Sequence, residues 1–139
     1  MLKVINGAEL KGNVFMNQNE SEIFGVHERK TEYEYRQLLL AAQKYFSYVA
    51  SNKIDPSIEY NIVIINSTGR DIVDAKFLFV DKSIQVKKVE NGYEYCGYDG
   101  RHRYYIAQKY GLNLLVDVVE DVTSNQKRNL SQIFKKPAK

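Results

Sequence analysis

The clearest hydrophobic pattern in the chain predicts one long amphipathic helix over residues 31–52. Thr31 and Glu34 have the spacing of a capping box, in which the threonine accepts from a first-turn N–H and the glutamate reaches back. Asp55 and Pro56 cannot continue a helix, so we expect it to end near residue 52. One face is predicted to pack on a core, because apolar residues recur there at helical spacing: Tyr35, Leu38, Leu39, Ala42, Phe46 and Val49.

Shorter apolar runs predict strands on either side of this helix. Residues 60–66 are rich in β-branched residues and are predicted to form a strand buried on both faces. A second strand is expected over residues 75–80, with residues 70–74 as a turn or short helix between them. Residues 2–10 alternate weakly and predict an edge strand, followed by a polar loop.

A β-hairpin is predicted over residues 84–97. Asn91-Gly92 favours the positive φ values of a tight type I′ turn, and alternating runs flank it on both sides. This is the strongest turn signal in the chain.

The remaining patterns complete the expected fold. A helix over residues 104–110 is stopped by Gly111 and leads into a strand over residues 114–119, and one short helix is expected beyond residue 121. At 139 residues the chain suits one domain. We therefore expect a single α+β domain with a mixed sheet and flanking helices.

Composition excludes several classes of protein. The 44% apolar and 27% charged residues are ordinary for a globular protein, and no apolar run approaches the roughly 20 residues that span a bilayer. The N-terminus lacks the pattern of a secretory signal, and the single cysteine, Cys96, cannot form an internal disulfide. We expect a cytoplasmic protein with no membrane role, and Cys96 as a small buried apolar residue.

The net charge of +3 is concentrated at the C-terminus. Residues 122–139 hold five basic residues and no acid, so the rest of the chain carries 3 minus 5, or −2. This tail is either a solvated basic end or a contact for DNA.

Candidate chemistry gathers where the predicted hairpin turns into the next helix. Asp99-Gly100-Arg101-His102-Arg103 combines a carboxylate, a glycine, two guanidiniums and an imidazole at a helix start. Free N–H groups there attract an anion, a glycine lets it approach closely, and basic side chains can clasp it. The sequence therefore predicts a phosphate site at this turn.

The hairpin, this turn, the following helix and the last strand together resemble the ParB/sulfiredoxin-like superfamily, with residues 84–119 as the matching part and 31–120 as the expected core. The resemblance implies that the turn binds the phosphates of a nucleoside triphosphate or diphosphate, with Gly100, His102 and Arg103 matching best. It gives no role to the longer segment at residues 53–82.

Departures from the superfamily pattern narrow the expected activity. Sulfiredoxins carry their catalytic cysteine where this chain has Arg101, so we do not expect sulfinic acid reduction. Chromosome-partitioning ParB proteins continue into a helix-turn-helix domain, for which too little chain follows Glu120. Free-serine kinases of the superfamily carry a similar turn and a His-Glu pair, whose counterparts here are His27 and Glu28.

The resemblance and the residues leave three functions open. The first is Mg²⁺-dependent phosphoryl chemistry, either nucleotide hydrolysis or kinase-like transfer; the second is a DNA-associated or nuclease-like accessory protein; the third is a binding module without catalysis. The assigned residues are Glu28, Asp99 and His102 for catalysis, Asp99 for Mg²⁺, and Gly100, Arg101, His102 and Arg103 for phosphate.

Overall fold

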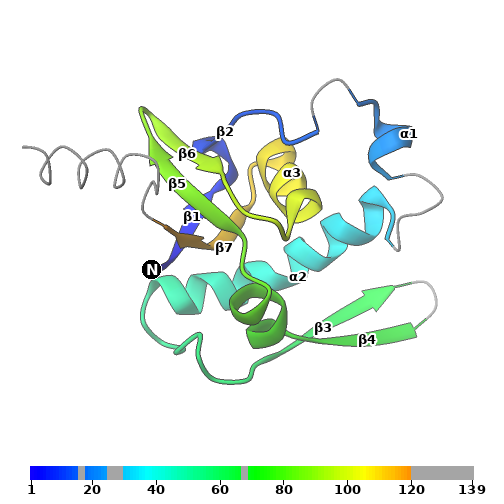
Figure 1. Ribbon diagram of the computed structural model, residues 1–139. Coiled ribbons are helices and arrows are strands. Elements are labelled where there is room, and N and C mark those ends of the chain that lie inside the picture. The colour runs from blue at the N-terminus through cyan, green and yellow to red at the C-terminus, as the bar shows by residue number, and fades with distance from the viewer. Residues whose placement is uncertain (16–17, 25–29, 67–68, 120–139) are drawn as a thin grey trace, which may run out of the picture.

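The computed structural model describes residues 1–15, 18–24, 30–66 and 69–119, and its longest helix is α2 (Glu32–Ala50) (Figure 1). The predicted capping box is present: the Thr31 hydroxyl accepts from the Glu34 N–H at 3.2 Å, and the Glu34 carboxylate accepts from the Thr31 N–H. The predicted helix is confirmed. Its buried residues are Leu38, Leu39, Ala42, Phe46 and also Tyr45, which the predicted face did not include.

A five-stranded mixed sheet lies beside this helix, with strand order β1-β7-β5-β6-β2. In chain order the strands are β1 (Leu2–Asn6), β2 (Leu10–Lys11), β5 (Gln85–Val89), β6 (Gly92–Tyr95) and β7 (Asn113–Val118). β1 runs antiparallel to β7, β5 lies parallel to β7 and antiparallel to β6, and β2 lies parallel to β6. The predicted N-terminal edge strand and the strand after Gly111 are both confirmed.

The predicted hairpin is confirmed as β5 and β6, but its turn is centred one residue earlier than expected. Val89 pairs with Gly92, so Glu90 and Asn91 occupy the middle of the turn. Asn91 has a φ of 67°, and Gly92, at 159°, already begins the strand. Only one central residue has a left-handed φ, so the expected type I′ turn is wrong.

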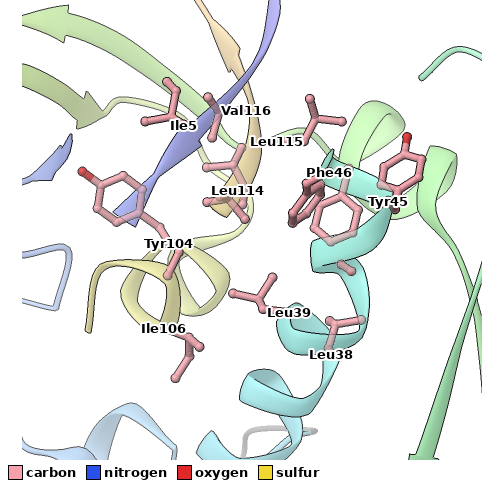
Figure 2. Close-up of a cluster of buried hydrophobic side chains, with 14 of the residues drawn as sticks. Ile5, Leu38, Leu39, Tyr45, Phe46, Tyr104, Ile106, Leu114, Leu115 and Val116 are labelled. Atoms are coloured by element: carbon pink, nitrogen blue, oxygen red, sulfur yellow. The ribbon is translucent and has the colours of Figure 1, made fainter. Parts of the chain in front are cut away.

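The hydrophobic core forms where α2 and α3 (Arg101–Tyr110) meet the sheet (Figure 2). Both helices contact β7, in which Leu114, Leu115 and Val116 are fully buried, so this strand is covered on both faces. Two short helices complete this part of the chain, η1 (Gly7–Glu9) and α1 (Glu20–Ile23), and the sequence pattern predicted neither. The whole forms a single α+β domain.

Residues 53–82 fold differently from the prediction. β3 (Asn61–Asn66) pairs antiparallel with β4 (Gly69–Asp74) in a separate two-stranded hairpin, which leads into a π-helix, η2 (Lys76–Asp81). The expected turn at residues 70–74 is thus a strand, and the expected strand at residues 75–80 is a helix. β3 is buried on one face only, since Ile62 and Ile64 are buried while Ile65 is 79% exposed.

In the described residues no helix is both long and apolar enough to cross a membrane. Residues 120–139 lie outside the described part of the chain, so the short C-terminal helix and the basic tail stay predictions.

Glu32 joins the start of α2 to the end of α3. Its carboxylate accepts from Lys109 Nζ at 2.9 Å and from the hydroxyl of Tyr110. These two hydrogen bonds, that of Tyr110 first, lower the pKa of Glu32 from its usual value of 4.5. The carboxylate also lies in the first turn of α2, where negative charge is favoured.

We expect Glu32→Gln to lower the free energy of unfolding by about 0.5–1 kcal/mol at pH 7. Because the folded-state pKa is depressed, the contribution of Glu32 is fully present above pH 4.5 and is lost as the pH falls through the lowered value. Urea unfolding of both proteins at a series of pH values measures this difference. Glu59→Gln, at an exposed carboxylate, is the control, and a gap that persists at low pH would contradict the assignment.

Candidate functional site

Gly100 builds the turn between the hairpin and α3. It is the N-cap of α3, with a left-handed backbone (φ 87°, ψ 20°), and it offers no side chain to the first-turn N–H groups. A Cβ at this position would lie 2.3 Å from Cγ1 of Ile84 and 2.9 Å from Nη2 of Arg103. The helix begins at Arg101 rather than at the predicted residue 104, so the basic residues of the motif form its first turn.

Arg103 points away from solvent and holds η2 in place. It is only 6% exposed, and its guanidinium donates to the carbonyl of Leu78 at 2.7 Å and to that of Lys82 at 3.0 Å. These carbonyls lie at the C-terminal end of η2, where backbone oxygens lack helical partners and a positive charge is favoured. Burial lowers the pKa of Arg103 to about 10, so the side chain stays charged at neutral pH.

A cation at the start of α3 therefore has a partner within the protein. Positive charge at the N-terminus of a helix is unfavourable unless a nearby partner offsets it. The carbonyls of η2 offset that cost, and Arg103 supplies a buried positive charge beneath Gly100.

His102 sits in a cluster of aromatic rings. Its ring stacks on Tyr35 at 5.1 Å and an interplanar angle of 7°, and it also contacts Phe15 at 4.8 Å and Phe24 at 5.4 Å. Nε2 lies 2.8 Å from the carbonyl oxygen of Ile23, which can only accept, so Nε2 carries a hydrogen. His102 thus joins α1, α2 and α3.

Asp99 and Arg101 are the exposed members of the motif. The Arg101 guanidinium lies 5.5 Å from the centre of the Phe15 ring, and the backbone carbonyl of Asp99 accepts from the Tyr95 hydroxyl at 3.2 Å. Cys96 is exposed as well, so its expected burial is wrong: it falls on the solvent side, just beyond the end of β6.

A pocket of about 490 Å³ opens beside the turn. Four of the predicted site residues line it, namely Asp99, Gly100, His102 and Arg103, whereas Arg101 does not. His27 and Glu28 lie outside the described residues. The other lining residues are Lys30, Tyr35, Leu38, Val73, Phe77, Leu78 and Lys82.

The far wall of the pocket comes from residues 53–82, for which the resemblance implied no role. Val73 of β4, Phe77 and Leu78 of η2, and Lys82 all belong to residues 53–82. Sequence reasoning missed Lys30, Phe77 and Lys82, because nothing local to each residue signals that the fold brings it to the turn. Tyr35 and Leu38 were at least on the predicted apolar face of α2.

The polar groups that line the pocket decide whether it could hold a divalent cation. Asp99 is the one carboxylate among the described residues that line the pocket, and no group of three or more His, Cys, Asp or Glu side chains gathers in the described ranges. Mg²⁺ at phosphate sites usually takes one or two protein carboxylates, with phosphate and water oxygens as the other ligands. The residues present fit a phosphate-bound Mg²⁺ held through Asp99.

We expect Gly100→Ala to destabilise the fold by about 2–4 kcal/mol, since it combines a strained φ with a clash against Ile84. Gly111→Ala is the matched control: it has a left-handed φ of 64° but open space around the added Cβ, so it should cost only about 1 kcal/mol. Thermal or urea unfolding measures both. Equal costs would mean that no close contact constrains the turn at Gly100.

Comparisons with known proteins identify no relative: no family model matches the chain, no curated protein sequence matches it, and no solved structure matches it.

Proposed function

We propose that the chain is a nucleotide-binding domain of the ParB/sulfiredoxin-like type, which takes a nucleoside diphosphate or triphosphate into the pocket beside Gly100. One observation carries the proposal: the pocket joins a helix N-terminus and basic side chains to an apolar wall. A nucleotide has the same two-part character, with an anionic phosphate end and a flat base.

Charge favours an anion in the pocket. Lys30, Lys82 and Arg103 carry three positive charges among its described lining residues, against the single carboxylate of Asp99. The first-turn N–H groups of α3 point out of the helix end and add the positive end of its dipole. Lys30 and Lys82 are exposed and have the freedom to close on a phosphate. Asp99 would hold Mg²⁺, which neutralises phosphate charge when bound.

The far wall of the pocket suits an aromatic base. Val73 and Phe77 line it, and the Phe77 ring is 55% exposed, so a base can reach its face. A volume of about 490 Å³ is in the range of small-molecule and cofactor sites. Stacking on such rings binds bases with little sequence preference.

Phosphoryl chemistry is the proposed activity, as nucleotide hydrolysis or as transfer to a hydroxyl such as that of free serine. Glu28 is the proposed base, which would accept the proton of the attacking hydroxyl. His102, assigned to catalysis from the sequence, is fixed by its bond to the Ile23 carbonyl. We therefore propose that it orients the turn rather than transferring a proton through Nε2.

A second proposal is an accessory role on DNA, favoured by the charge of residues 122–139, which hold five basic residues and no acid. In that case the tail adds non-specific phosphate contacts. A binding module without catalysis would use the same pocket and lack only the role of Glu28.

Two substitutions separate the phosphate end from the base end of the pocket. Lys82→Ala should weaken binding of both Mg²⁺-ADP and pyrophosphate about 3- to 10-fold, because it removes a charged contact to phosphate. Phe77→Ala should weaken ADP about 5-fold or more but leave pyrophosphate unchanged, because only the base contacts the ring. Isothermal titration calorimetry measures all four affinities.

Both side chains are exposed enough to be replaced without unfolding the domain, and Lys44→Ala, on α2 outside the pocket lining, is the control. Unchanged affinities in the Lys82 and Phe77 variants would remove the pocket as the nucleotide site.

Glu28→Gln tests the proposed chemistry independently of binding. We expect the rate of ATP turnover to fall about 10²- to 10⁴-fold, as for loss of a general base. The rate is measured as phosphate release or as transfer of phosphate to serine. The affinity for ADP should stay within twofold of the unchanged protein. A fully active variant would rule out Glu28 as the base.

A further inference from the structure

The β3–β4 hairpin leaves one strand edge open. In the described part of the chain β4 pairs with β3 alone, and β3 is the strand that packs on α2. Figure 1 shows the hairpin as an arm at the lower right, with β4 on the side away from α2. An open strand edge offers unpaired N–H and C=O groups to another strand.

The register of the hairpin identifies which groups face outward. The Ala75 N–H donates to the Tyr60 carbonyl at 2.8 Å, and the next pair along, Asn61 with Asp74, is therefore a non-hydrogen-bonded pair. Alternation then directs the backbone groups of Arg70, Ile72 and Asp74 away from β3 and toward the open edge.

The outer face of the same hairpin is apolar at its centre. Val63 pairs directly with Ile72, and these side chains are 39% and 59% exposed. Arg70 and Asp74 lie on the same face as Ile72, two residues away on either side. Along this face β4 therefore presents a positive, an apolar and a negative side chain in turn.

From this arrangement we propose that β4 pairs antiparallel with β4 of a second copy of the chain, about a twofold axis through Ile72. The pairing places Ile72 opposite its own symmetry mate, and Arg70 of each copy opposite Asp74 of the other. A four-stranded sheet results, with Val63 and Ile72 of both copies in one apolar row across it. The proposal does not depend on nucleotide binding.

Charge selects this register over its neighbours. A twofold axis at Arg70, Asp71 or Asp74 would place like charges opposite each other. An axis at Val73 would place Arg70 opposite Lys76 and Ile72 opposite a carboxylate. Only the axis at Ile72 places every charged side chain of β4 on the outer face across from a side chain of opposite charge.

A contact of one strand edge is small, so the dimer should form reversibly and depend on concentration. Sedimentation velocity of the full chain, from about 10 μM to about 500 μM, should show a shift from monomer to dimer, because interfaces of this size bind at micromolar affinity or weaker.

Charge reversal gives the decisive test. Arg70→Asp alone and Asp74→Arg alone should each remain monomeric, because every pair across the axis then repels. An equimolar mixture of the two variants should dimerise again, because both pairs across the axis become attractive. Lys44→Asp, on the exposed face of α2, is the control and should dimerise like the unchanged chain.

Asp74 also accepts from the Lys76 N–H at 3.1 Å, so folding of its variant is checked by circular dichroism. Ile72→Asp is the fallback, since it places two carboxylates on the axis at an exposed position and should abolish the dimer. A chain that stays monomeric throughout, a dimer that survives Arg70→Asp, or a mixture that does not associate would each overturn the proposal.

Discussion

The buried guanidinium of Arg103 joins α3 to η2, since it donates to backbone carbonyls that lie 25 and 21 residues earlier in the sequence. Burial of a charge is costly unless hydrogen bonds satisfy it, and the carbonyls of Leu78 and Lys82 do so. The same bonds complete the end of η2 and fix it beside Gly100. Arg103 therefore ties the far wall of the pocket, which includes Phe77 and Leu78, to the turn at Gly100.

Local signals explain which elements could be predicted. The capping box of α2 and the Asn-Gly sequence at the β5–β6 turn act within a few residues, and both the helix and the hairpin form, although the turn is centred one residue earlier than expected. The apolar run at residues 75–80 is ambiguous, since short runs suit a strand or a buried helix. Its outcome as η2 depends on distant partners, among them Arg103 and the Phe46 ring, whose centre lies 4.9 Å from that of Phe79. Nothing near Phe79 in sequence encodes either partner.

The candidate site likewise has features that the local sequence predicts and features that depend on the tertiary fold. The turn at Gly100 was recognisable because a glycine and basic residues at a helix start have a direct chemical meaning. The roles within it were less accessible: Arg103 faces inward, His102 is held among aromatic rings, and Arg101 points elsewhere. Lys30 and Lys82 reach the pocket only through the tertiary fold.

The pairing of β1 with β7 has a consequence for how the chain folds. Leu2 lies opposite Asp117, so β1 forms its ladder with a strand that is synthesised long after it. α2 and the β5–β6 hairpin rely on nearby residues and can form early, whereas closure of the sheet at β1 must wait until β7 has been synthesised. During translation, β1 would therefore remain unpaired until β7 had emerged from the ribosome.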